Sequence, residues 1–215
     1  VDPDGWACED IQYCVDHDLM NGTGNRTFAP KMVMTRAQMV QVLYNIVGEP
    51  AVTGETTFTD LTANWYQNAV LWAYQTGVAS GMSETTFAPD QEMSRAMLAV
   101  ILYAMAGEPA VTGEGPFTDV PAGCWYTDAI VWAAQNGIVC GFGDGTFRPN
   151  GQMSRAMFAM VLWRVAGSPA SSAALPFADV AADAWYADAV RWAYAAGVIN
   201  GVSTTAFDPE SPVTR

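Results

Sequence analysis

The chain has 215 residues, of which 51% are hydrophobic and 14% charged, and its 22 acidic against nine basic side chains give a net charge of −13. This share of apolar residues can build a large core and excludes a disordered chain. The acidic balance, with Lys31 as the single lysine, argues against partners such as nucleic acid or anionic membrane surfaces, which need fields of Lys and Arg. No apolar run reaches the roughly 18 residues of a membrane span, so no membrane insertion is expected.

A short segment of Met or Val, then Thr or Ser, then Arg occurs four times and defines a repeat. Its arginines are Arg36, Arg95, Arg155 and Arg215. A nearly constant interval of about 60 residues indicates a repeat protein whose copies stack on one another. The predicted repeats, which together form one structural unit, are 1–54, 55–113, 114–174 and 175–215. The first lacks its N-terminal part and the fourth stops after the arginine, which leaves four copies of the first half and three of the second.

The first half of each repeat is predicted to contain an amphipathic helix. In the second repeat, Trp65, Ala69, Trp72 and Ala73 have the i, i+4, i+7, i+8 spacing of one helix face. A glycine such as Gly77 then ends the helix, because a residue without a Cβ readily adopts the left-handed conformation found there. The β-prone segments that follow are brief, so β-structure is expected only as short ribbons in loops.

The second half of each repeat is predicted to contain a more apolar helix. Thr35, Ser94 and Ser154 are favourable N-caps, and Thr35 with Gln38 has the sequence of a capping box. The residues 96–105 are apolar around the whole helix, which outside a membrane indicates a helix enclosed on all sides. The fold class is therefore mainly α, with three such helices at the centre.

The four cysteines do not recur with the repeat and match no zinc-binding spacing. Cys8 and Cys14 are six residues apart on a predicted helix, a rise of about 9 Å, which is too far for a disulfide. We expect buried free thiols, with a cross-repeat disulfide as the alternative.

Five motifs recur together at this period: Phe-x-Asp, Trp-Tyr, Gly-x-x-x-Gly, Phe-x-Pro and Thr/Ser-Arg-Ala. On these motifs nearly the entire chain resembles the S-layer homology (SLH) family. The resemblance implies a central three-helix bundle with pseudo-threefold symmetry. It also implies that exported proteins are anchored non-covalently to secondary polymers on Gram-positive peptidoglycan, often pyruvylated glycans held in grooves between repeats. The family's Thr-Arg-Ala-Glu motif loses its Glu here, where Gln38, Met97 and Met157 stand, so a different polymer could be preferred.

Arg36, Arg95 and Arg155 are the first candidates for ligand binding. A helix start offers free amides and the positive end of the helix dipole, and an arginine there adds a fork that matches a carboxylate. The positive charge also recurs at one place in an acidic chain, which favours an anionic ligand. The alternatives are a surface residue or a structural clamp between repeats.

Three further sets recur beside these arginines, and each has a structural alternative. Trp65, Trp125 and Trp185 either stack on sugar rings or belong to the core. Asp60, Asp119 and Asp179 either cap the following turn or bind a sugar hydroxyl. Gly81, Gly141 and Gly201 either form a tight turn or let a ligand approach the backbone.

Catalytic chemistry has little to build on in this sequence. His17 is the single histidine and has no copy in the other repeats, so no catalytic triad, zinc site or other metal site is expected. We expect no enzyme and no cofactor.

The sequence therefore predicts a non-catalytic anchoring module that binds an anionic secondary cell-wall polysaccharide, outside the cell at the wall or S-layer. The main alternative is a protein-binding or assembly scaffold of a surface layer, and a glycan-processing enzyme with paired carboxylates is the third reading. Because the predicted threefold unit has room for three outer helices, the fourth, at 185–196, either covers a groove in its own chain or docks on a neighbour. We expect the second, so that repeat 4 mediates self-association.

Overall fold

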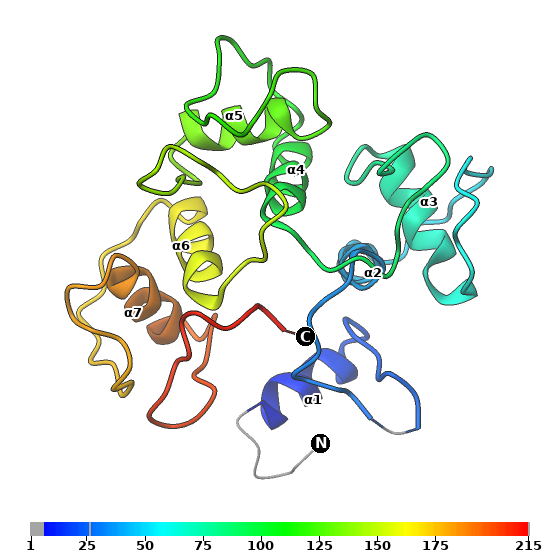
Figure 1. Ribbon diagram of the computed structural model, residues 1–215. Coiled ribbons are helices and arrows are strands. Elements are labelled where there is room, and N and C mark those ends of the chain that lie inside the picture. The colour runs from blue at the N-terminus through cyan, green and yellow to red at the C-terminus, as the bar shows by residue number, and fades with distance from the viewer. Residues whose placement is uncertain (1–6, 26, 215) are drawn as a thin grey trace.

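The computed structural model describes residues 7–25 and 27–214, and they form a mainly helical protein, as predicted (Figure 1). Inner helices α2 (Arg36–Ile46), α4 (Arg95–Met105) and α6 (Arg155–Val165) surround the middle of the molecule. Outer helices α3 (Gln67–Gln75), α5 (Thr127–Gln135) and α7 (Ala187–Ala195) lie outside them, and a short 3-10 turn, η1 (Asn64–Tyr66), precedes α3. Helix α1 (Cys8–Asp16) lies at the lower edge of Figure 1, in the sector without an inner helix.

The inner helices begin where the caps predict. The Thr35 hydroxyl accepts a hydrogen bond from the backbone N–H of Gln38, whose side chain accepts one from the N–H of Thr35, which completes the predicted capping box. The hydroxyls of Ser94 and Ser154 likewise accept hydrogen bonds from the backbone N–H groups of Met97 and Met157 at the starts of α4 and α6. The outer helices end before Gly77, Gly137 and Gly197, whose φ angles of 75°, 67° and 67° confirm the left-handed position predicted there.

Each inner helix packs against the outer helix of the following repeat. The pairs in close contact are α2 with α3, α4 with α5, and α6 with α7. Alanines on the outer helices, at Ala69, Ala129 and Ala189, are at most 2% exposed. Because alanine is small, it lets two helix backbones approach closely. The core is therefore divided into three main clusters, each built from two consecutive repeats. A smaller cluster of Ala7, Ile11 and Phe28 lies within the first repeat.

The expected central three-helix bundle is not confirmed. Among the described residues, no two of the inner helices approach each other closely along their backbones. Met39, Leu98 and Phe158 from the three helices instead line a shared apolar cavity of about 150 Å³. Apolar side chains with a gap between them, rather than interlocked helices, occupy the centre, and the pseudo-threefold symmetry is likewise not confirmed.

Isolated β-bridges join the segments that precede the inner helices and close them into a ring. Thr35 pairs with Glu92, Ser94 with Gln152, and Ser154 with Pro212, and Val33 pairs with Thr214 to connect the first repeat to the fourth. A hydrogen bond of 2.9 Å from the Asn200 amide to the Asp10 carboxylate supports this last contact. The described residues form these bridges but no strand, so the ribbons expected in the loops are absent from them.

The fourth outer helix, α7, is not free for the self-association predicted through repeat 4. Helix α7 buries Ala189, Val190 and Ala193 against α6 within the same chain, because the pairing runs from an inner helix to the next repeat. Among the described residues, helix α1 makes no close backbone contact with an inner helix, unlike α3, α5 and α7. Its Tyr13 is 57% exposed and stacks on His17, with ring centroids 3.9 Å apart. Self-association itself stays a prediction.

The four cysteines are free thiols, as expected, but they are not buried: three are half-buried and Cys140 is exposed. Each lies in the first half of a repeat, on an outer helix or in a loop at its ends, where it is not needed to fill the core. Within the described residues, no helix is both long enough and apolar enough to cross a bilayer.

Candidate ligand-binding grooves between the repeats

The repeated arginine joins one repeat to the next. Nε of Arg95 donates a hydrogen bond of 2.8 Å to the carbonyl of Phe147, and Nη2 donates one of 2.9 Å to the carbonyl of Cys140. The guanidinium carbon also lies 4.3 Å from the centre of the Phe147 ring. The equivalent bonds measure 2.9 and 2.7 Å for Arg36 with Phe87 and Ser80, and 2.8 and 2.6 Å for Arg155 with Phe207 and Asn200.

Burial changes the ionisation of these arginines without neutralising them. Arg36 and Arg95 are only 5% and 6% exposed, and this burial lowers the pKa of each side chain to about 10, against a smaller upward effect of the Asp60 and Asp119 carboxylates. Burial lowers the pKa of Arg155 as well. Each side chain is therefore still charged near neutral pH, and main-chain carbonyls solvate the charge in place of water.

This geometry is that of the clamp between repeats, the structural alternative for these arginines. Ligand binding by Arg36, Arg95 and Arg155 stays a prediction, since all three also line cavities between repeats. Arg95 keeps one side of its guanidinium toward such a cavity, where Nη1 lies 3.2 Å from the Met157 sulfur. Nε and Nη2 of each of the three arginines nevertheless already donate hydrogen bonds to main-chain carbonyls.

Each aspartate of the Phe-x-Asp motif holds a distant turn. The Asp119 carboxylate accepts hydrogen bonds of 2.7 Å from the N–H groups of Phe147 and Arg148, 28 and 29 residues further on. Asp60 and Asp179 bind the equivalent Phe-x-Pro turns. The middle residue of these turns has φ between 57° and 59°, which is costly for a residue with a Cβ. Each aspartate therefore does cap a turn, as the structural alternative expected. The turn is the distant Phe-x-Pro turn, however, and not the turn that directly follows the aspartate.

The Asp179 carboxylate should make the stability of the protein depend on acid pH. Burial opposes ionisation of Asp179, but the N–H groups of Phe207 and Asp208 outweigh it and hold the pKa of Asp179 below its usual value. A depressed folded-state pKa stabilises the fold above the unfolded pKa of about 3.9, and this contribution is lost as pH falls through the folded value. We expect Asp179→Asn to cost roughly 1 kcal/mol at pH 7, since the site is exposed. Urea unfolding at several pH values should show this difference shrinking below pH ~4, and a constant difference would contradict the assignment.

The glycines of the three loops are needed for close packing. A Cβ on Gly141 would lie 2.4 Å from the Phe117 ring and 2.6 Å from the Thr146 carbonyl oxygen. Gly81 and Gly201 lie equally close to Phe58 and Phe177. A ligand approach to these glycines stays a prediction, but the phenylalanine of the Phe-x-Asp motif already occupies one side of each.

The tryptophans of the Trp-Tyr motif are at the surface, although the helical pattern placed Trp65 on a buried face. Trp65, Trp125 and Trp185 are 55%, 36% and 58% exposed. Each precedes its outer helix, so its ring is free of the helix contact that buries the alanines. The neighbouring tyrosine turns inward instead, and Tyr66 is 2% exposed. Stacking of these rings on a sugar therefore stays a prediction, and their exposure is compatible with it.

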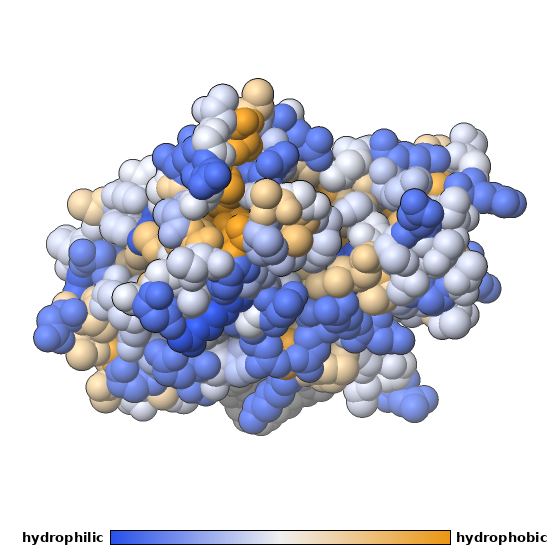
Figure 2. Space-filling view, turned by 45° about the horizontal axis from the view of Figure 1, so that its top comes forward, coloured by the Kyte–Doolittle hydropathy of each residue, from blue (hydrophilic) through white to orange (hydrophobic). Residues whose placement is uncertain are grey.

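Each exposed tryptophan borders a cavity between an inner helix and the following repeat, which we name the Trp65, Trp125 and Trp185 grooves. Their volumes are about 770, 20 and 370 Å³. Figure 2 shows one face of the molecule, on which strongly apolar residues gather near the upper middle among hydrophilic ones. The Trp185 groove contains Arg95 and Arg164, and the much smaller Trp125 groove contains Arg36. Arg155 borders a different cavity of about 300 Å³, lined by Ile11 and Cys14 of α1.

Sequence reasoning missed the residues that make the grooves differ. The Trp65 groove contains the side chains of Gln38, Gln41 and Asn45, and the Trp185 groove contains Arg164. The signal was available by aligning the repeats on their arginine. Such an alignment puts Asn45 and Arg164 at a position where the second repeat has Ala104. Within the described residues no three potential metal ligands cluster.

Comparison with known proteins agrees with the repeated motifs. The pattern of the S-layer homology domain matches residues 1–40, 57–97, 116–159 and 176–215, which is well over half of the chain. A surface-layer 125 kDa protein of Lysinibacillus sphaericus is 29% identical over 167 residues, covering 74% of this chain and 14% of the relative. A cellulosome-anchoring protein of Acetivibrio thermocellus is 26% identical over 179 residues, covering 78% and 40%.

An amylopullulanase of Thermoanaerobacterium thermosulfurigenes is also 26% identical over 167 residues, but the match covers only 9% of its length against 75% of this chain. The chain thus spans less than half the length of each of these relatives. What is shared is the repeated segment and not the rest of those proteins. From its four tandem matches and recurring motifs, the chain belongs to the S-layer homology domain family.

Proposed function

We propose that this chain is a non-catalytic module that anchors a protein to the cell wall by binding an anionic secondary polysaccharide, such as a pyruvylated glycan, in grooves between its repeats. The observation that carries the proposal is the Trp185 groove. It combines an exposed tryptophan with two arginines in a cavity of about 370 Å³. This size falls in the range of roughly 300–1,000 Å³ of small-molecule sites.

The chemistry of this groove suits an acidic sugar. The face of Trp185 offers a flat apolar platform for a sugar ring. Arg164 lies in the last turn of α6 and forms no salt bridge with the other described residues, so its fork can bind a carboxylate in two hydrogen bonds. In a chain with a net charge of −13, a site with two arginines is a local exception to the overall repulsion of anions.

The relatives support the proposed location. One is named a surface-layer protein and another a cellulosome-anchoring protein. Both names describe proteins held outside the cell. We therefore propose that this chain works at the cell wall or S-layer, with the polymer attached to peptidoglycan as its partner.

The direct test is sedimentation of the chain with purified cell walls, before and after chemical removal of the secondary polymer. Wild type should bind only the untreated walls. Arg164→Ala and Trp185→Ala should each weaken binding about tenfold or more, because each removes a contact of the charged sugar. Arg191→Ala is the matched control, since Arg191 pairs with Asp188 on the surface of α7 and lies outside the groove.

Circular dichroism of each variant confirms that the fold is retained. Equal binding to treated walls would contradict recognition of the polymer. If the chain bound no walls but assembled into larger species in light scattering, the scaffold alternative would replace the anchoring function. Undiminished binding by both groove variants would show that the ligand sits elsewhere.

A further inference from the structure

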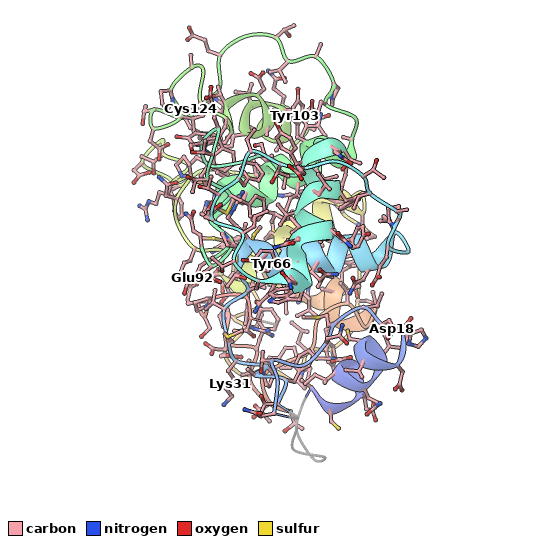
Figure 3. All side chains as sticks on the ribbon, turned by 90° about the vertical axis from the view of Figure 1, so that its right-hand side faces the viewer. Asp18, Lys31, Tyr66, Glu92, Tyr103 and Cys124 are labelled. Atoms are coloured by element: carbon pink, nitrogen blue, oxygen red, sulfur yellow. The ribbon has the colours of Figure 1, made fainter. Side chains whose placement is uncertain are left out.

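The Trp65 groove is the largest of the three and the most polar. Its volume is about 770 Å³, and it is lined by helix α2, the segment after α1 and the start of α3. Figure 3 faces the side of the molecule that carries α1 and α3, and it labels Asp18 just after α1 and Tyr66 just before α3. Six side-chain amides lie along the groove, and they belong to Asn21, Gln38, Gln41, Asn45, Asn64 and Asn68.

The fold does not require these amides. The positions of Gln38, Gln41 and Asn45 on α2 correspond to Met97, Val100 and Ala104 on α4, which forms the same helix pair with its neighbour. The third repeat has Met157, Met160 and Arg164 there. Because apolar residues serve at two of the three positions in both other repeats, the amides of α2 are specific to this groove.

The amides are linked to one another but not fully satisfied. The Gln41 side-chain N–H donates a hydrogen bond of 2.6 Å to Oδ1 of Asn45, whose own N–H donates one of 3.1 Å to the Leu19 carbonyl. Oε1 of Gln41 is buried and accepts no hydrogen bond from any described residue. Leaving a buried acceptor unpaired is unfavourable, so Gln41 does not improve the stability of the fold through this oxygen.

An uncharged, hydroxyl-rich sugar fits this chemistry. Each amide has both a donor and an acceptor, so neighbouring amides can bind neighbouring hydroxyls, which also donate and accept. The exposed ring of Trp65 supplies an apolar face at the groove edge. Both grooves have a glutamate in their lining, but in the Trp185 groove two arginines outweigh Glu210. No basic residue offsets Glu49 in the lining of the Trp65 groove, which disfavours an acidic ligand here.

We propose that the Trp65 groove is a second glycan site that binds a neutral sugar unit through Gln38, Gln41 and Asn45, while the Trp185 groove takes the acidic unit. The proposal rests on the function proposed above, because it assigns the two grooves to different sugars of one polymer. A polymer that alternates neutral and acidic units would then contact two repeats of one chain at once. Two linked contacts bind more tightly than either alone.

The test grafts the residues of the second repeat into the groove with Gln41→Val and Asn45→Ala. The probe is the disaccharide of N-acetylglucosamine. Its binding to the full chain is measured by calorimetry or ligand-observed NMR. Wild type should bind it with a Kd of about 1 mM or below, and the double variant at least tenfold more weakly. The melting temperature should stay equal or rise, because an unpaired buried acceptor is removed.

Two controls separate this proposal from the anchoring function. Arg164→Ala should keep full affinity for the neutral disaccharide, and the double variant should keep its affinity for glucuronic acid as an anionic probe. Equal disaccharide binding by the double variant, or no binding by wild type at about 10 mM, would overturn the second site and leave the anchoring function standing. A fall in melting temperature with unchanged disaccharide affinity would show that the amides are structural. Loss of wall binding in Arg164→Ala alone bears only on the anchoring function.

Discussion

Replacing Arg95 with alanine is expected to lower the free energy of unfolding by about 3–5 kcal/mol. The substitution removes two hydrogen bonds from a charged donor and leaves the carbonyls of Phe147 and Cys140 without these partners. It also removes the cation that lies over the Phe147 ring. Because these contacts join the second repeat to the third, the loss should weaken the connection between core clusters and not one helix alone.

Urea unfolding followed by circular dichroism measures this effect. Arg191→Ala is the matched control, and as a surface ion pair it should cost no more than about 1 kcal/mol. Arg95→Lys should also be destabilising, since a single ammonium cannot reach both carbonyls in the geometry of the fork. A change below about 1 kcal/mol in Arg95→Ala would contradict the clamp. Because the clamp supports the fold, an alanine at this position is unsuitable for testing ligand binding, which is why Arg164 is used for that purpose.

Replacing Phe147 with alanine should cost a similar amount, about 3–5 kcal/mol. The ring is 1% exposed, lies against Phe117 with centroids 5.2 Å apart, and supports the Arg95 guanidinium. Its removal leaves a cavity at the point where the Phe-x-Asp motif, the Phe-x-Pro turn and the arginine of the preceding repeat meet.

Trp185→Ala is the control for Phe147→Ala, because it removes a larger ring that is 58% exposed and should change stability by less than about 1 kcal/mol. The double variant Arg95→Ala with Phe147→Ala should be less destabilised than the sum of the single variants, since the two side chains are in contact. Full additivity would show that the ring and the guanidinium do not depend on each other.

The local structure could be predicted from the sequence to a large extent. The caps at Thr35, Ser94 and Ser154 and the helix ends before Gly77, Gly137 and Gly197 were all found where the pattern put them. Each depends on the chemistry of a few neighbouring residues, such as a hydroxyl near a free N–H or a missing Cβ. The period of about 60 residues also determined the repeat architecture and, through its motifs, the family.

The pairing of the repeats could not be predicted in this way. The sequence shows an apolar face on each helix but not which face meets which, so the fourth outer helix was assigned to a neighbouring molecule although α7 packs on α6. The same limit applies to the central bundle. An apolar helix such as α4 can be enclosed by its outer partner, the loops and a small cavity without touching the other inner helices closely.

The candidate site, too, was predictable from the sequence only in part. The sequence by itself determined which residue types recur, namely an arginine, an aspartate, a glycine and a tryptophan at fixed places in the repeat. Only the tertiary structure decided that the arginine and aspartate bind main-chain groups 27 to 52 residues away, while the tryptophan faces solvent. The physical reason is that a hydrogen bond or a buried ring depends on distances between repeats, and these are set by the packing of whole helices and not by the residues next to each motif.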